Sequence, residues 1–195
     1  MSNTIDDKIV REYVVRLQEG DESAFEPLMD LFQRPIFNLV YRMINHYEEA
    51  ADLSQEIFIK MYKSIDQYQG RAKFSTWFFS IAVNMSLNRR RKLASRKREA
   101  YSLDAAGDDE ARDARDTPDS RPGPDARARH HEIRERVELA IAGLPDEFRG
   151  VVAMRDIQGM SYEEISKAAE CGVGTVKSRL SRGRGILREQ LKDLL

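Results

Sequence analysis

The stretch SYEEISKAAECGVGTVKSRLSRGRGIL, residues 161–187, decides the fold of the C-terminal part of the chain. Ser161 and Glu164 have the spacing of a capping box, in which each side chain accepts a hydrogen bond from the other residue's backbone N–H. A helix is therefore predicted to start here. The CGVG that follows predicts a tight turn, and a second helix is expected to begin near Thr175. Two helices joined by a short turn that contains glycine form a helix-turn-helix.

The second helix of this pair carries a strongly basic surface. Between Gly174 and Arg188 it contains five basic residues and no acidic one. Arg and Lys on such a face can reach guanine acceptors or phosphates in a major groove, and short Ser side chains permit close approach. A solvated amphipathic helix is the alternative, but the capped helix and the turn upstream favour DNA recognition. The residues expected to contact duplex DNA are Thr175, Lys177, Ser178, Arg179, Ser181 and Arg182.

A second stretch, AKFSTWFFSIAVNMSLNRRRK at residues 72–92, combines an aromatic end with a basic end. Aromatic rings at the edge of an element, beside basic residues, can stack unpaired bases, and arginines bind phosphates. The alternative is that most of the rings belong to the core, and we prefer it for Phe78 and Ile81. The candidate residues for single-stranded DNA and the adjoining duplex are Arg71, Lys73, Phe74, Ser75, Thr76, Trp77, Asn84, Asn88, Arg89, Arg90 and Arg91.

The other apolar residues also follow helical spacing, so the fold class is predicted to be all-α. Asp21 is the expected N-cap of a helix that contains Phe25 and Phe32, and Pro35 fits the start of a further helix. Gly183 and Gly185 are each unfavourable by about 1 kcal/mol relative to Ala in a helix. They predict either fraying of the basic helix or close packing against it.

An acidic segment divides the chain. Residues 99–126 have a net charge of −6, whereas the residues before them have +3 and those after them +2. The segment also has three prolines and few large apolar residues, so we interpret residues 99–127 as a flexible acidic linker between two small helical domains, residues 5–98 and 128–195. Two uses of its charge stay open, a solvated tether and a segment that resembles the charge of RNA.

Composition argues against several other classes of protein. The chain has one cysteine, Cys171, and three histidines, so neither an intrachain disulfide nor a metal site is expected, and no cofactor is predicted. No segment is apolar for long enough to cross a membrane, and there is no pattern of a signal peptide. The cytoplasm is the expected location. The glycines of CGVG do not match a phosphate-binding loop, which needs a different spacing and a preceding strand.

The order of these features resembles a bacterial RNA polymerase sigma factor of the extracytoplasmic-function type. The resemblance rests on GDESAFEPLMDLF, DLSQEIFIKMYKSI, FSTWFFSIAVNMSLNRRR and LPDEFRGVVAMRDIQGMSYEEISKAAECGVGTVKSRLSRGRGIL. It implies that residues 5–98 form a sigma region 2-like domain that binds core polymerase and melts and reads the −10 element. It also implies that residues 128–195 form a region 4-like domain that reads the −35 element as duplex.

The resemblance further implies specific partners. The residues that match the helix docking on the clamp helices of the largest catalytic subunit are Asp52, Gln55, Glu56 and Lys60. Promoter DNA is the second partner, and an anti-sigma factor is expected as a third. Taken without the resemblance, Asp52 and Glu56 are a carboxylate pair on one helical face, either solvated or, less favourably, catalytic.

Two other classes of protein compete with this interpretation. A free-standing helix-turn-helix regulator would bind a palindromic operator as a dimer, but no apolar dimer seam is evident and the aromatic-to-basic helix would have no role. An enzyme acting on nucleic acid would need a metal cluster or a nucleophile with its base, and the sequence offers neither. The chain is therefore not expected to be an enzyme.

Overall fold

The computed structural model describes residues 6–103 and 124–194, with side chains at 6–96 and 132–194, and its regular elements there are all helical. This confirms the predicted fold class. The N-terminal domain consists of α1 (Asp7–Gln18), α2 (Phe25–Ile44), α3 (Tyr47–Lys63) and α4 (Phe74–Leu103). The C-terminal domain consists of α5 (Pro124–Gly143), α6 (Asp146–Val152), α7 (Tyr162–Ala168) and α8 (Val173–Gln190). Most of the predicted linker, residues 99–127, lies outside the described residues.

The core of the N-terminal domain is built around the ring of Phe32. This side chain is fully buried on α2, and three rings of α4 meet it edge-on, those of Phe74, Phe78 and Phe79 at 5.6, 5.4 and 6.0 Å between centroids. Phe58 of α3 closes the cluster, with its ring 5.2 Å from that of Phe78. Edge-to-face packing is the favoured arrangement of such rings. The aromatic end of α4 is therefore largely what attaches this helix to α2 and α3.

One prediction about helix boundaries is wrong. Pro35 does not begin a helix, because α2 continues through it from Phe25 to Ile44. Proline inside a helix removes one backbone hydrogen bond and typically costs about 3 kcal/mol. The buried stripe of α2 nevertheless keeps helical spacing on both sides of Pro35, and burial of its side chains offsets that cost. These side chains are Leu28, Phe32, Ile36, Leu39, Val40 and Met43.

The helix-turn-helix is present as predicted, but the residue with left-handed backbone geometry in its turn is not one of the two glycines. The Ser161 hydroxyl accepts from the backbone N–H of Glu164, and the Glu164 carboxylate accepts from that of Ser161, so the capping box is complete. The left-handed residue of the turn is Glu170, with φ 48°, and neither glycine of CGVG has a positive φ. Gly172 is instead the N-cap of α8, which begins at Val173.

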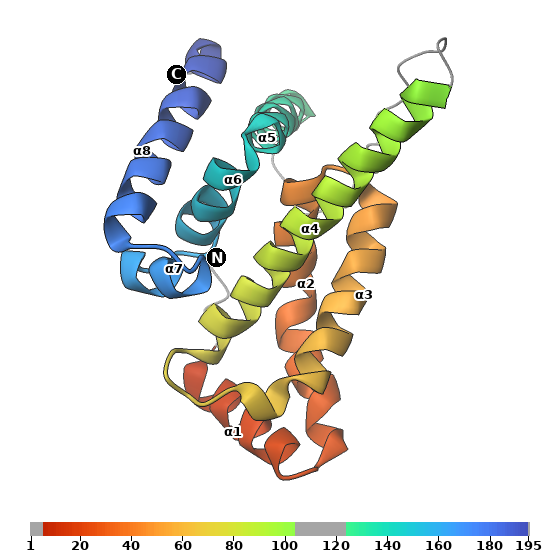
Figure 1. Ribbon diagram of the computed structural model, residues 1–195, viewed down its shortest axis with the longest axis vertical. Coiled ribbons are helices and arrows are strands. Elements are labelled where there is room, and N and C mark those ends of the chain that lie inside the picture. The colour runs from red at the N-terminus through yellow and green to blue at the C-terminus, as the bar shows by residue number, and fades with distance from the viewer. Residues whose placement is uncertain (1–5, 104–123, 195) are drawn as a thin grey trace.

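The two domains pack against each other along α4 (Figure 1). This helix lies diagonally across the molecule, with α2 and α3 on one side and α6 and α7 on the other. Gly150 of α6 approaches α4 so closely that an added Cβ would lie 3.3 Å from Leu87 and 3.5 Å from Val83. The buried apolar side chains of both domains consequently form one continuous cluster.

The position of α8 depends on a second close contact. Gly183 is buried against α6, and an added Cβ would lie 2.9 Å from Cγ2 of Val152 and 3.2 Å from Cβ of Phe148. Nothing lies within 4 Å of a Cβ added at Gly185. Of the two explanations offered for these glycines, close packing holds at Gly183, and α8 continues through both without interruption.

This contrast predicts opposite effects of two alanine substitutions. Both Gly183→Ala and Gly185→Ala gain about 1 kcal/mol of helix propensity, but only the first adds a methyl group to a filled contact. Overpacking typically costs about 1–3 kcal/mol. The free energy of unfolding, measured by urea titration, should be lower for Gly183→Ala than for Gly185→Ala by about that amount. Equal stabilisation by the two substitutions would contradict the packing described here.

Candidate nucleic-acid interface

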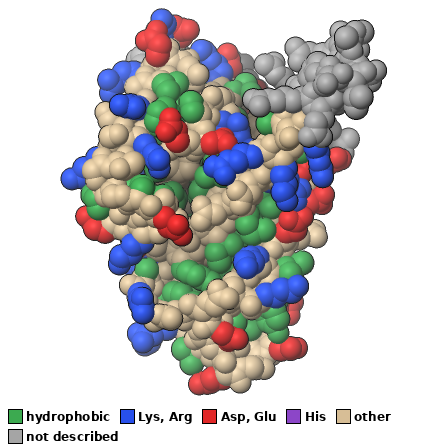
Figure 2. Space-filling view, viewed as in Figure 1, with side chains coloured by type: hydrophobic (Ala, Val, Ile, Leu, Met, Phe, Trp, Pro, Cys, Tyr) green, Lys and Arg blue, Asp and Glu red, His purple; other side chains and the backbone are tan. Residues whose placement is uncertain are grey.

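The predicted duplex-binding face of α8 is open to solvent. Five of its six candidates are exposed, namely Thr175, Lys177, Ser178, Ser181 and Arg182. The sixth, Arg179, is half-buried, with Nη1 3.9 Å from Sγ of Cys171 in the preceding turn. The opposite side of the helix buries Val176, Leu180 and Gly183. Figure 2 shows Lys and Arg side chains spaced along the edge of the molecule that α8 forms.

Contacts around Tyr162 connect α8 to α7 and to the residues that follow α6. The Tyr162 ring lies between two cations, with the Arg155 guanidinium 4.9 Å and the Lys177 ammonium 5.7 Å from its centroid. Arg184 of α8 forms an ion pair with Asp156 at 2.5 Å, and this contact raises the pKa of Arg184. These contacts attach α8 to α7 and to the segment that follows α6.

The aromatic end of α4 is less exposed than its sequence suggested. Phe74 is 4% exposed and lies edge-on to both Phe32 and Tyr68, so its ring has no free face here. Trp77 is half-buried, 5.4 Å from the Tyr68 ring and 5.6 Å from the Phe74 ring. Ser75 is also half-buried. Trp77 is therefore the ring of this group that keeps partial access to solvent.

Lys73 and Thr76, beside these rings, already have partners within the chain. The Lys73 ammonium is 2.6 Å from Asp7, whereas Arg71 is exposed. Thr76 is 7% exposed, and its hydroxyl donates a hydrogen bond of 2.7 Å to Glu164 at the start of α7. The candidate surface for single-stranded DNA is thus in contact with the helix-turn-helix.

Opposing effects set the pKa of Glu164. Partial burial alone would raise it, but hydrogen bonds from the Ser161 backbone N–H and the Thr76 hydroxyl, together with the charge of Lys73, outweigh burial. The pKa of Glu164 is therefore lower than that of an ordinary glutamate. Its carboxylate links the capping box to the first turn of α4.

The middle of α4 presents polar groups to solvent before its basic end. Asn84 and Asn88, one helical turn apart, are both exposed. Arg89 follows, but its guanidinium donates 2.6 Å hydrogen bonds to both Glu49 and Glu56 of α3. These contacts raise the pKa of Arg89 and hold it against α3.

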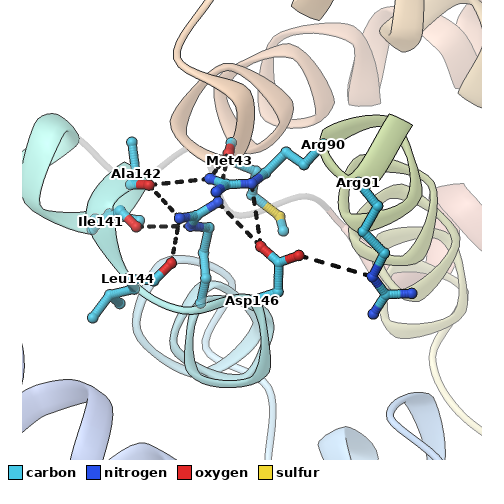
Figure 3. Close-up of polar contacts among 8 residues, drawn as sticks. Met43, Arg90, Arg91, Ile141, Ala142, Leu144 and Asp146 are labelled. Atoms are coloured by element: carbon cyan, nitrogen blue, oxygen red, sulfur yellow. Dashed lines mark hydrogen bonds and ion pairs between the residues drawn. The ribbon is translucent and has the colours of Figure 1, made fainter. Parts of the chain in front are cut away.

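Arg90 and Arg91 lie against the C-terminal domain (Figure 3). Their Nε atoms lie 3.2 and 3.9 Å from the two carboxylate oxygens of Asp146. Arg149, which the sequence interpretation did not single out, lies beside them and is fully buried. The sequence contains one signal of this role, a charged residue next to Phe148 in an otherwise apolar stretch.

The four polymerase-binding candidates lie along the outer face of α3. Asp52, Gln55, Glu56 and Lys60 are all exposed. Beside them, Ile59 is 53% exposed at the edge of a groove between α2 and α3. Apolar side chains of both helices line this groove, among them Phe25, Met29, Phe37 and Phe58. An apolar groove with a polar rim is typical of a protein-binding surface.

Residues 6–103 and 124–194 contain neither a metal site nor a membrane-spanning helix. In this part of the chain no cluster of His, Cys, Asp and Glu has the geometry to hold a metal ion. The same residues include no helix that is long and apolar enough to span a membrane.

Comparison with known proteins matches both domains to one family. Residues 28–96 match the model of sigma-70 region 2, and residues 134–187 match that of sigma-70 region 4. The ECF RNA polymerase sigma factor SigW of Bacillus subtilis is 35% identical over 95% of this chain and 98% of its own. This chain belongs to the ECF RNA polymerase sigma factors. This sigma factor is also 32% identical to the ECF sigma-E factor of Escherichia coli K12, over 100% of this chain and 99% of the relative.

Solved structures share the fold of this sigma factor. The sigma factor RpoE of Bartonella quintana, in complex with the anti-sigma factor NepR, has a TM-score of 0.64 at 23% identity over 86% of this chain and 96% of that one. CnrH in complex with the cytosolic domain of CnrY has the same TM-score at 19% identity, over 95% and 98% of the two chains.

Family membership decides between the classes that the sequence left open. This sigma factor directs core RNA polymerase to promoter DNA, and it is not an enzyme. The dimeric operator-binding regulator is excluded as its class. Region 2 corresponds to α2, α3 and most of α4, and region 4 to the described helices from α5 to α8.

The low pKa of Glu164 predicts a pH-dependent loss of stability. At neutral pH, Glu164→Gln should lower the free energy of unfolding by about 0.3–1 kcal/mol, because Gln can keep the capping hydrogen bond but loses the negative charge at the start of α7. Because the folded pKa is depressed, the carboxylate contributes fully above its unfolded pKa, and this contribution is lost as the pH falls through the folded pKa. The difference from wild type should therefore shrink below about pH 4.3. The control is Glu163→Gln, an exposed carboxylate in the same turn. A pH-independent difference would rule out this assignment.

Proposed function

We propose that the two domains divide promoter recognition between them. The N-terminal domain binds core polymerase through α3 and melts and reads the −10 element through α4. The C-terminal domain reads the −35 element as duplex through α8. The observation that supports this division is the exposed basic face of α8, on a different domain from the candidates of α3 and α4.

Docking on polymerase is assigned to the exposed face of α3. Asp52, Gln55, Glu56 and Lys60 supply polar contacts, and Ile59 with the adjoining groove supplies apolar area. A central apolar contact surrounded by polar groups is the usual arrangement of a specific interface. The clamp helices of the largest polymerase subunit are the proposed partner of this face.

The −10 element is assigned to α4 and to the segment before it. Trp77 can stack an unpaired base, and Asn84 can bind a base edge with its amide. Ser75, Thr76 and Phe74 then shape the pocket around that base, while Asn88 and the cations bind the backbone. These cations are Arg71, Lys73, Arg89, Arg90 and Arg91.

The −35 element is assigned to the N-terminal half of α8. Lys177, Ser178 and Arg182 share one face with Ser181, and Thr175 and Arg179 lie beside it at the start of the helix. The N-terminal end of a recognition helix is the part that enters the major groove.

Dependence on polymerase tests this assignment, because the residues before and after the acidic segment carry net charges of only +3 and +2. Such weak charge gives little counterion release on binding DNA. In gel-shift and run-off assays over a promoter panel, the isolated protein should bind duplex weakly, and core polymerase should produce a salt-resistant open complex with transcription. Tight sequence-specific binding by the protein alone would contradict the proposal.

Asn84→Ala should separate melting from the other steps. Asn84 is exposed, so the variant should fold, bind core polymerase and contact the −35 duplex as wild type does. Permanganate reactivity of −10 thymines should be lost on a duplex promoter, and a template with a pre-opened −10 bubble should restore transcription partly. Wild-type melting by the variant would remove Asn84 from the −10 site.

We also propose a regulatory partner and a location. The solved structures of the same fold contain the anti-sigma factor NepR and the cytosolic domain of CnrY. An anti-sigma factor is accordingly the proposed third partner, beside polymerase and promoter DNA. The cytoplasm, where RNA polymerase acts, is the proposed location.

A further inference from the structure

The segment that precedes α4 has little backbone support of its own. Residues 68–73, here named the pre-α4 loop, connect the short 3-10 helix Ile65–Gln67 to α4. Among the described residues, no N–H group of residues 69–73 donates a hydrogen bond to a backbone carbonyl. Gly70 turns the loop with a φ of 68°, a conformation that favours glycine. The shape of the loop therefore depends on side chains that contact it.

Gln18, the last residue of α1, holds the start of this loop. Its amide nitrogen, Nε2, donates hydrogen bonds to the carbonyls of Ile65 and Tyr68, each at 2.9 Å. A carbonyl only accepts, so the nitrogen of the amide and not its oxygen must face this pair. In Figure 1, α1 lies beside the segment that leads into α4. An N–H donor at position 18 is thus what attaches the loop to α1.

Tyr68 extends this attachment to the aromatic end of α4. Its hydroxyl donates to the carbonyl of Ala72 at 2.7 Å, across the loop. Its ring centroid lies 5.4 Å from that of Trp77 and 5.5 Å from that of Phe74. Trp77 is the ring assigned above to the stacking of an unpaired base. The position of Tyr68 therefore connects Gln18 to the stacking surface.

The first turn of α1 contacts the other end of the loop through an ion pair. The Asp7 carboxylate lies 2.6 Å from the Lys73 ammonium and raises the pKa of Lys73. The two side chains are 56% and 63% exposed, and an ion pair so open to solvent adds little stability. The Gln18 amide instead makes two directed hydrogen bonds, of which the one to Ile65 is partly buried. Gln18 is therefore the main attachment.

We propose that Gln18 is a positioning residue for −10 recognition, which fixes through Tyr68 the pre-α4 loop and the Trp77 ring that receive an unpaired base. This proposal rests on the −10 assignment made above. Because α1 lies outside residues 28–96, the part that matches region 2, the −10 site is supported from beyond that region. A loop held in one conformation loses less freedom on binding and presents a single pocket to the base.

The fluorescence of Trp77, the one tryptophan of the chain, tests the attachment directly. Gln18→Glu keeps the shape of the side chain but places an oxygen against two carbonyls. Lys8→Gln, at an exposed position of α1, makes the same change in net charge and is the control. In the isolated full chain, Gln18→Glu should shift Trp77 emission to longer wavelength and increase its quenching by acrylamide. Identical spectra and quenching in all three proteins would overturn the proposal.

Promoter selectivity tests the role in recognition. Transcription with core polymerase is measured on promoters that are changed one base at a time in the −10 and −35 elements. Gln18→Glu should lose about tenfold of the preference for the best −10 sequence, within the range that stacking of one base contributes. Its preference among −35 sequences should equal that of wild type, and Lys8→Gln should match wild type at both elements.

The remaining outcomes separate this proposal from the function on which it rests. Retention of both preferences by Gln18→Glu would overturn the proposal, whatever the fluorescence shows. Equal loss of both preferences would also overturn it, since a residue needed only for folding affects both elements alike. A wild-type protein without preference among −10 sequences would instead refute the −10 assignment itself, and the positioning role with it.

Discussion

The guanidinium of Arg149 holds together the ends of two helices from different domains. It is fully buried, and its N–H groups donate to the carbonyls of Ile141, Ala142 and Leu144 around the end of α5 and to that of Met43 near the end of α2. The last carbonyls of a helix have no partner within it, and a buried guanidinium has five donors to satisfy. The guanidinium N–H groups and the helix-end carbonyls therefore provide each other's hydrogen-bond partners. The negative ends of the two helix dipoles also stabilise the cation. Because α6 carries Arg149, this one interaction sets where α6 lies, and α7 and α8 pack on α6 and on the helical segment Ala153–Ile157 that follows it.

Ion pairs also engage three arginines at the basic end of α4. Arg89 is paired with two glutamates of α3, and Arg90 and Arg91 share Asp146. Nonspecific binding to DNA depends on cations that are free to replace condensed counterions. The paired arginines of α4 therefore contribute less than free cations would to nonspecific DNA binding by the isolated sigma factor. The pairing therefore disfavours nonspecific DNA binding by the free sigma factor relative to promoter recognition by the sigma factor bound to core polymerase.

Local features of the structure were predictable from the sequence, and non-local ones were not. Helical spacing, the capping box at Ser161 and the basic face of α8 depend on residues within a few turns of one another, and the structure contains all three. Differences from the sequence-based expectations arose where distant packing overrides a local preference. Pro35 lies inside α2 because the buried stripe on both sides outweighs the lost hydrogen bond. Phe74 is in the core because Phe32 and Tyr68 surround it, which no spacing within its own helix reveals. Arg149 was missed for the same reason, since one of its partners is 106 positions away.

The interdomain surface combines apolar and polar contacts. Its apolar part, where Gly150 meets Val83 and Leu87, stabilises the contact between the domains. Its polar part consists of hydrogen bonds and ion pairs, whose loss is largely compensated when the same groups bind water or phosphate. Arg90 can thus exchange the carbonyls of Met43 and Ala142 for DNA phosphates at small net cost. A wholly apolar interface would offer no such exchange and would have to be exposed without compensation. The interdomain contacts and the proposed binding of DNA phosphates therefore draw on the same guanidiniums.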